Sequence, residues 1–367
     1  MWAATDGDYG DPVTEFDDVL ATARNDGADI RDTMARLIFG PRILAQVLRC
    51  VAEFGVADHL AAGPRLPADL ASEAGLDPSA TARLLRYCAT IGLVQRDVDG
   101  RYGGTDLLAT LRSGDPHGLR SFAVAQNGPG QWALLSRLDE AVRTGTPQAV
   151  PALGRGLYDY YGLPETAGEA AAYREGLAGR GVDLQTALVE LIDTSDVDRV
   201  LDIGGSVGSM VLALMAANPR LQGAVLDRPD AASAADTAAR RLGLSDRFEF
   251  IAGDFFSDVP GSDMYLLKNV LGNWDDERCV SILETSRRKA LSGSRWIILE
   301  NAIDETRPSR WSVDVDIMTM VAVGGRVRSV DDYRVLLSRS GLRFVRNTPT
   351  ASGFEMIEAE LSSVGSD

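Results

Sequence analysis

The stretch VLDIGGSVGSMVLALMAANPRLQGAVLD, residues 200–227, determines the fold expected for the C-terminal half of the chain. An apolar run ends at Asp202, and a turn with Gly204 and Gly205 follows it. A helix-like apolar segment then leads to a second apolar run, which ends at Asp227. A strand, a glycine turn, a helix and a parallel strand form the first crossover of a doubly wound sheet, beside which ligands bind.

The same alternation continues towards the C-terminus. Further strands are expected at 247–254, 263–271 and 295–303, helices at 230–243, 275–291 and 330–341, and a closing hairpin at 343–361. Strands that alternate with helices indicate a parallel sheet covered by helices on both faces. The closing hairpin predicts that the sheet ends in an antiparallel strand. The expected fold is therefore an α/β, Rossmann-like domain.

The N-terminal half has a helical texture, with a break expected at the Gly-Pro pair 40–41. Its sharpest segment is 66–105, where a helix at 67–74, a second helix after Asp77 and a strand pair turning at 99–100 outline a winged helix. We therefore expect three parts: a disordered acidic N-terminus (1–27), a helical winged-helix domain for dimerisation and lid formation (28–190), and the α/β domain (191–367).

A winged helix can bind DNA, so a ligand-sensing transcriptional regulator is the rival interpretation. The second helix offers only Arg83 and Arg86 for phosphate contacts, and the chain carries a formal net charge of −16. Because phosphate neutralisation supplies much of DNA affinity, this charge disfavours nucleic acid, and it also disfavours anionic membranes. A dimerisation role is the preferred interpretation.

The few histidines and cysteines narrow the chemistry further. Only His59 and His117 are present, and Cys50, Cys88 and Cys279 lie far apart. This pattern predicts no metal site held by histidine or cysteine, and it argues against a histidine-dependent triad. Buried thiols, no apolar run long enough to span a membrane and no signal-peptide pattern favour a cytoplasmic protein.

The glycine turn favours a cationic adenosyl ligand. It departs from G-x-G-x-x-G, because Ser206 stands where the second glycine is needed for a pyrophosphate. The carboxylate of Asp202 repels phosphate and tolerates a cation, which favours S-adenosylmethionine over NAD. Asp227 can accept the ribose hydroxyls. Asp254 can accept from the adenine amino group, and Phe255 offers its ring face to the purine.

On these residues, the C-terminal half resembles small-molecule S-adenosylmethionine-dependent O-methyltransferases, a family that includes plant caffeic acid enzymes and bacterial polyketide enzymes. The N-terminal half resembles their dimerisation domain. The segment MVAVGGRVRS (320–329) is similar to the anthracycline branch, which contains O-methyltransferases and a hydroxylating relative. The resemblance implies a class I methyltransferase fold, a homodimer and a small aromatic substrate, with S-adenosylhomocysteine as product.

The resemblance also implies roles for residues at the strand ends. The residues that would surround the cofactor are Gly204, Gly205 and Ser206 at its methionine part, Asp227 with Arg228 at the ribose, Asp254 and Phe255 at the adenine, and Lys268 near the amino-acid end. The residues that would line an apolar acceptor pocket are Trp132, Met318 and Met320, with Phe122; ordinary core packing is the competing interpretation for each. Tyr158, Tyr160 and Tyr161 either close the cofactor site or pack the seam between domains.

The general base of the plant enzymes is missing. Where those enzymes carry His-Asp-Trp, this chain has Gly272-Asn273-Trp274, and the two glutamates that orient the histidine correspond to Glu300 and Val327. The predicted catalytic residues are therefore Asn273, which would orient the acceptor, and Glu300.

Without this base, several reactions remain open. O-methylation can rely on proximity, because effective molarities of about 10⁵–10⁸ M exceed the roughly 10²–10⁴-fold gain from a base. C- or N-methylation, or a bound cofactor that transfers no methyl group in a hydroxylase, decarboxylase, cyclase or pericyclase, are the alternatives.

Overall fold

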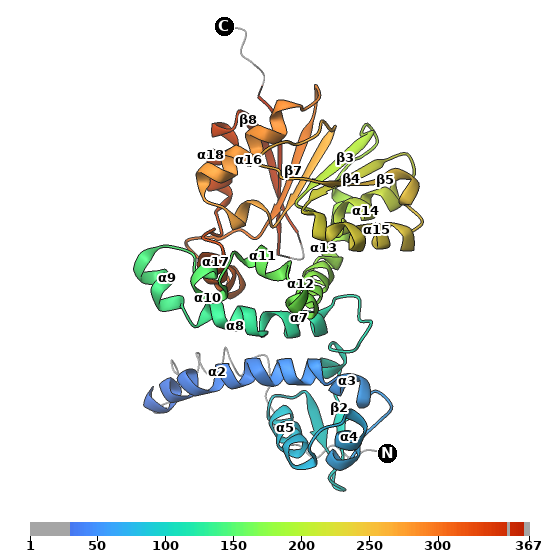
Figure 1. The fold of residues 1–367 in the computed structure, drawn as a ribbon, viewed down its shortest axis with the longest axis vertical. Coiled ribbons are helices and arrows are strands. Elements are labelled where there is room, and N and C mark those ends of the chain that lie inside the picture. Colours follow the sequence, from blue (N-terminus) through green and yellow to red (C-terminus); the bar gives the residue numbers. More distant parts are fainter. Residues whose placement is uncertain (1–29, 351–352, 363–367) are drawn as a thin grey trace. The chain divides into compact units, whose positions relative to one another are not determined.

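The computed structural model describes residues 30–350 and 353–362. The chain divides into two compact units, Met1–Gly128 and Pro129–Asp367, and each is described by itself (Figure 1). The disorder expected for residues 1–27 lies outside the described part of the chain. The domain boundary at 190/191 stays a prediction; the helices between Pro129 and that boundary belong to the same compact unit as the sheet.

The first unit contains the predicted helix-turn-helix and hairpin. Its elements are α2 (Ile30–Glu53), α3 (Val56–His59), α4 (Pro67–Ala74), α5 (Pro78–Thr90), β1 (Val94–Arg96), β2 (Tyr102–Gly104), α6 (Asp106–Ala109) and α7 (Leu119–Gln126). Gly75 ends α4 in a left-handed conformation (φ 68°), and the Asp77 side chain caps α5 by accepting from the N–H of Ala80 at 2.8 Å. The winged-helix outline follows from these local signals.

The expected break at Gly40-Pro41 is wrong. Helix α2 runs through Pro41 without interruption. Proline removes one backbone hydrogen bond and strains the turn before it. Packing of the C-terminal half of α2 offsets this cost, because Val51 and Ala52 are fully buried.

A seven-stranded sheet forms the centre of the second unit, in the order β5-β4-β3-β6-β7-β9-β8. The strands are β3 (Arg199–Ile203), β4 (Gln222–Asp227), β5 (Phe248–Ala252), β6 (Met264–Lys268), β7 (Arg295–Glu300), β8 (Leu342–Pro349) and β9 (Glu355–Leu361). Strands β3 to β7 are parallel, β9 is antiparallel to β7, and β8 is antiparallel to β9. The predicted parallel sheet with an antiparallel end is confirmed.

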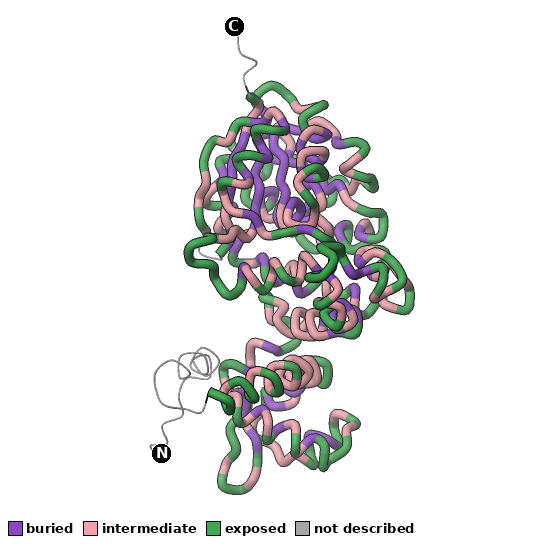
Figure 2. Tube along the Cα trace, turned by 90° about the vertical axis from the view of Figure 1, so that its left-hand side faces the viewer, coloured by how far each residue is buried: buried purple, intermediate pink, exposed green. Residues whose placement is uncertain are grey.

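Helices cover both faces of this sheet. One core cluster joins α13 (Val182–Leu191), α14 (Ser209–Ala217) and α15 (Ala232–Arg241) to one face, and a second joins α16 (Asp276–Arg288) and α18 (Val330–Arg339) to the other. Alternate residues of β3 supply them, since Val200 belongs to the first cluster and Leu201 to the second. Figure 2 shows the buried residues concentrated along these strands. This arrangement is the Rossmann-like fold that the sequence predicts.

The remaining helices of the second unit form a smaller cluster of their own. They are α8 (Pro129–Leu135), α9 (Leu138–Thr144), α10 (Ala149–Leu153), α11 (Leu157–Tyr161), α12 (Ala167–Gly179) and α17 (Arg310–Ala322). Leu134 of α8, Tyr161 of α11 and Val321 of α17 lie in one core cluster. Among the described residues, no helix has the length and apolar character needed to cross a membrane.

Candidate active site and cofactor site

The carboxyl ends of β3, β4 and β6 meet at one edge of the sheet, with β3 between the other two. Within the described residues, Ser206 (φ 52°) and Asn269 (φ 54°) are the two non-glycine residues with positive φ, and both follow these strand ends. Such a conformation costs about 1–2 kcal/mol and collects at ligand sites. The edge is therefore the candidate cofactor site.

The glycine turn and Asp227 are hydrogen-bonded to each other. The backbone N–H of Ser206 donates to Asp227 Oδ2 at 2.7 Å, and that of Arg228 donates to Oδ1 at 2.7 Å. Burial raises the pKa of Asp227, and these two bonds partly oppose that shift. A Cβ on Gly204 would lie 3.7 Å from Phe255 Cε1, so the aromatic ring predicted for the adenine flanks the turn.

A second carboxylate, Asp202, is buried beneath the turn with 1% of its surface exposed. A Cβ on Gly205 would lie 2.6 Å from Asp202 Oδ2, so a side chain there would collide with the carboxylate. Burial raises the pKa of Asp202 to about 7, opposed mainly by the charge of Lys268, which ends β6. Burial lowers the pKa of Lys268 in turn.

The hydrogen bonding of Asp202 tests whether these residues suit S-adenosylmethionine. Its Oδ1 is buried and has no hydrogen-bond partner. An unpaired buried acceptor is costly, and a cationic ligand relieves that cost. The ammonium and sulfonium groups of S-adenosylmethionine are cations and it carries no phosphate, so the residues present fit this cofactor.

Two of the predicted cofactor residues are engaged locally. The exposed guanidinium of Arg228 donates to Asp159 Oδ1 at 2.9 Å, on α11, and lies 3.3 Å from Asp230 Oδ1. The exposed carboxylate of Asp254 accepts from the N–H of Phe256 at 2.9 Å and from Ser257 Oγ at 3.1 Å. The carboxylate of Asp254 therefore stabilises its own turn, and its role at the adenine stays a prediction.

Strand β6 ends at Lys268, earlier than expected, and the 3₁₀ helix η4 (Leu271–Asn273) follows. Glu300, at the end of β7 and 4% exposed, accepts from the N–H of Gly272 at 3.2 Å. Burial raises the pKa of Glu300 to about 7. The amide of Asn273 donates through Nδ2 to the carbonyl of Asn269 at 2.8 Å. Asn273 thus lies in η4, and Glu300 accepts a hydrogen bond from the same short segment.

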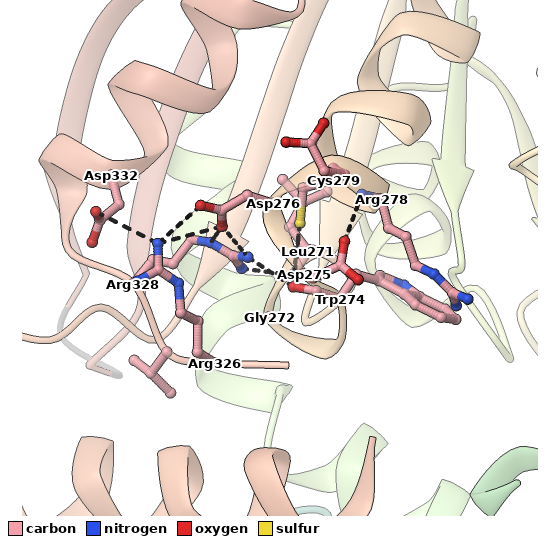
Figure 3. Close-up of polar contacts among 12 residues, drawn as sticks. Leu271, Gly272, Trp274, Asp275, Asp276, Arg278, Cys279, Arg326, Arg328 and Asp332 are labelled. Carbon is pink, nitrogen blue, oxygen red and sulfur yellow. Dashed lines mark hydrogen bonds and ion pairs between the residues drawn. The ribbon is translucent and has the colours of Figure 1, made fainter. Parts of the chain in front are cut away.

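A buried arginine holds the other side of this segment (Figure 3). Arg328 is fully buried and donates to the carbonyls of Leu271 at 3.0 Å and Trp274 at 2.7 Å. Its Nη2 also lies 2.7 Å from Asp276 Oδ1, and Cys279 Sγ lies 3.1 Å from the Leu271 carbonyl oxygen. The sequence does not single out Arg328, because a loop arginine next to Ser329 predicts an exposed side chain.

Gly325 lets the backbone approach η4 closely, and its replacement tests that contact. A Cβ on Gly325 would lie 2.7 Å from Asn273 Cα and nearer still to the Gly272 carbonyl oxygen. Gly325→Ala should therefore destabilise the protein by about 1–3 kcal/mol in chemical denaturation. Gly168→Ala is the matched control, because its Cβ meets open space in α12 and should leave stability unchanged or slightly raised. Equal stability of both variants would contradict the close approach.

The predicted acceptor-site residues of the second unit lie on α8 and α17, which pack against each other. Trp132 on α8 is 38% exposed, Met318 on α17 is half-buried, and Met320 packs against the small helical cluster. Phe122 belongs to the first compact unit. Exposed apolar surface on α8 is compatible with an aromatic ligand, whereas Met320 has the features of core packing.

The tyrosines of α11 separate by role. Tyr161 accepts from Gln131 Nε2 at 2.9 Å and stacks on Tyr173, so it packs the helical cluster. Tyr160 donates to Glu169 Oε2 at 3.0 Å. Burial raises the pKa of Tyr158, and the charges of Asp227 and Glu300 add to that shift. Among the tyrosines of α11, Tyr158 is thus the one whose pKa responds to both Asp227 and Glu300.

The fold and this cationic-ligand edge together define a class I methyltransferase. The chain belongs to the O-methyltransferase family: residues 135–343 match the model of the O-methyltransferase domain, and residues 36–112 match that of the O-methyltransferase dimerisation domain. The predicted family, fold class and S-adenosylmethionine cofactor are confirmed at this level. The dimerisation domain supports the predicted homodimer.

Named relatives extend over most of the chain. It is 31% identical to the phenazine O-methyltransferase PhzM of Lysobacter antibioticus, over 86% of this chain and 92% of the relative. It is 33% identical to the mitomycin biosynthesis 6-O-methyltransferase of Streptomyces lavendulae, over 84% and 88%. Among solved structures, the O-methyltransferase NcsB1 from neocarzinostatin biosynthesis, in complex with S-adenosylmethionine and 2-hydroxy-5-methyl naphthoic acid, is 29% identical with a TM-score of 0.77, covering 89% and 98%.

Proposed function

We propose that this enzyme methylates a hydroxyl group on an aromatic small molecule of bacterial secondary metabolism. The observation that carries the proposal is the unpartnered, buried Asp202 Oδ1 beside the Gly205 turn, which suits a methyl donor with a cationic sulfur. Two relatives are named for phenazine and for mitomycin biosynthesis, and the structure of NcsB1 contains a naphthoic acid, which supports an aromatic acceptor. One relative, 30% identical to this chain, is named as an N,N-dimethyltransferase, whereas the relatives from phenazine and mitomycin biosynthesis are named as O-methyltransferases.

S-adenosylmethionine, when bound, supplies an activated methyl group. In this proposal its methionine part is held by Gly204, Gly205, Ser206 and Lys268, its ribose by Asp227 with Arg228 beside it, and its adenine by Asp254 and Phe255. Asn273 orients the acceptor through its amide oxygen, since its amide nitrogen already donates to Asn269. Trp132 and Met318 contact the acceptor rings, and Met320 packs against the small helical cluster.

We also propose a cytoplasmic location. Cys50, Cys88 and Cys279 are all free thiols, and burial raises the pKa of Cys88 and of Cys279 to about 12, so both remain protonated and inert. Free thiols fit a reducing compartment. Within the described residues, no group of three or more His, Cys, Asp or Glu side chains could hold a metal ion.

Methyl-labelled S-adenosylmethionine tests the reaction directly. Incubation with hydroxyphenazines, hydroxynaphthoates and hydroquinones should place label in one acceptor class.

Asp227→Asn should weaken S-adenosylhomocysteine binding about 10–100-fold by calorimetry, because hydrogen bonds to a charged group contribute about 1.5–3 kcal/mol. Asp230→Asn, an exposed neighbour, should bind normally. Substrate turnover with intact cofactor, or equal binding by both variants, would contradict the assignment.

A further inference from the structure

Gly272 stands directly in front of a buried carboxylate. A Cβ built on Gly272 would lie 3.1 Å from Glu300 Oε2, and its next neighbour outside that side chain, the carbonyl oxygen of Arg326, would be 3.9 Å away. Gly272 itself is half-exposed. Because glycine has no side chain, residue 272 places nothing between Oε2 and the space in front of the segment.

The carboxylate of Glu300 is held by a hydrogen bond to one oxygen, and its other oxygen can accept a further donor. Glu300 Oε1 accepts from the N–H of Gly272 at 3.2 Å, which fixes the carboxylate plane. Burial raises the pKa of Glu300 to about 7, and hydrogen bonds from the backbone of Gly272, Leu271 and Val270 oppose that shift. A carboxylate has about four lone-pair sites, so Oε2 can accept a further proton donor. A base acts best when its pKa is near the operating pH.

We propose that Glu300 is the general base of this enzyme and takes the acceptor hydroxyl proton at Oε2, across the gap left by Gly272. The inference rests on the proposed methylation of a hydroxyl group. The acceptor O–H bond breaks and its proton passes to Oε2. The oxygen electron pair forms the new O–CH₃ bond, while the electrons of the broken S–CH₃ bond stay on sulfur. Glu300 then returns its proton to solvent.

Several charged and titratable groups surround Glu300, and the tyrosines and the cysteine among them do not exchange a proton near neutral pH. Those that interact with it or face it are Lys268 from β6, Arg328 before α18, Tyr158 from α11, Tyr333 from α18, Cys279 from α16, and Glu355, its register partner on β9. Burial raises the pKa of both tyrosines and of the cysteine, so all three stay protonated at neutral pH. Glu355 Oε2 accepts from Asn347 Nδ2 at 2.7 Å.

The first experiment compares Glu300→Gln with the wild type on the acceptor that takes label. Glutamine keeps the side-chain length and an oxygen for the Gly272 N–H but cannot take the proton. We expect kcat to fall about 10²–10⁴-fold. In the wild type, activity should rise with pH through about 7, because the base must be ionised. The variant should lose that limb of the profile.

Two further variants separate chemistry from structure. Glu169→Gln makes the same chemical change at a glutamate that also accepts a backbone N–H, that of Gly130 at 3.0 Å, and it should retain full activity. Gly272→Ala places a methyl group against Oε2 and should lower kcat while Glu300 stays in place. Glu300→Gln activity within threefold of the wild type, with an unchanged pH profile, would overturn the proposal.

A readout without cofactor keeps this test separate from the proposed function. The protein is labelled with ¹³C at the glutamate carboxyls and observed by NMR, and the signal that is absent from Glu300→Gln is assigned to Glu300. Because aspartate is not labelled, the titration of Asp202 does not appear in these spectra. That signal should titrate near pH 7 and move when 2-naphthol is added, but not with 2-methoxynaphthalene. Titration below pH 5, or no response to 2-naphthol, overturns the general base. Failure of methyl transfer in the wild type overturns the proposed function instead.

Discussion

Arg328→Met should lower the free energy of unfolding by about 2–4 kcal/mol, because it removes the hydrogen bonds of a buried charged donor, and a bond to a charged group contributes about 1.5–3 kcal/mol. Arg328 is fully buried, and its loss removes the charged donor from the carbonyls of Leu271 and Trp274, of which Leu271 still accepts from the Trp274 N–H and Cys279 Sγ. It also removes one of the two arginines that lower the pKa of Asp276. Methionine fills part of the same volume, so the loss reflects the polar contacts more than a cavity. Chemical denaturation measures the change.

Arg326 provides the matched control for this substitution. It contacts the same Asp276, at 3.2 Å, but its side chain is 51% exposed. Exposed ion pairs contribute about 0–1 kcal/mol, so Arg326→Met should change stability by less than 1 kcal/mol. If the two variants lose similar amounts, burial of the Arg328 contacts is not what stabilises the segment.

Asp202→Asn should stabilise the protein without cofactor by about 2–4 kcal/mol at pH 8. Burial raises the pKa of Asp202 from 3.8 to about 7, and each pKa unit corresponds to about 1.36 kcal/mol. Because the pKa of Asp202 is higher in the folded than in the unfolded protein, this carboxyl destabilises the fold least below pH 3.8. Its destabilising effect grows as the pH rises towards 7. Asparagine carries no charge, so the gain should shrink to about 1–2 kcal/mol at pH 5. Loss of the counter-charge to Lys268 keeps the gain below its ceiling.

The same substitution should weaken cofactor binding. Asparagine cannot offer a negative charge to a cationic ligand, so S-adenosylmethionine affinity should fall at least tenfold by calorimetry. Asp254→Asn is the control for stability, because its exposed carboxylate should give less than about 0.5 kcal/mol at either pH. A destabilised Asp202→Asn protein at pH 8 would mean that the buried carboxylate is compensated, contrary to the unpaired Oδ1.

These two variants address opposite features of one edge of the sheet. Arg328 completes the hydrogen bonds of the segment that carries Gly272 and Asn273, whereas Asp202 has an oxygen left unpaired under the glycine turn. In the proposed function, the segment with satisfied hydrogen bonds orients an acceptor, and the carboxylate with an unpaired oxygen attracts a cation at a cost in stability. Binding sites commonly carry such a cost, and the rest of the fold supplies the stability.

The strands, the glycine turn and the hairpin could be predicted from the sequence, because each depends on neighbouring residues. Apolar runs that end at Asp202 and Asp227 specify adjacent parallel strands, and Gly204 and Gly205 specify the turn between strand and helix. From that order alone the ends of β3 and β4 had to lie together, and the bond between Ser206 and Asp227 follows from it. The cofactor could be predicted from the same residues.

The contacts proposed to compensate for the missing histidine depend on long-range packing. Glu300 meets Gly272 across 28 residues of chain, and Arg328 reaches Leu271 across 57. No local pattern encodes such contacts, because they depend on how β7, α18 and η4 pack in three dimensions. The continuous α2 shows the same limit, since packing overrode the break that Gly40 and Pro41 predict. Local hydrogen bonding and periodicity depend on residues that are close in the sequence, so they can be predicted from it. Burial and long-range charge contacts join residues that are far apart in the sequence, so they exist only once the chain has folded.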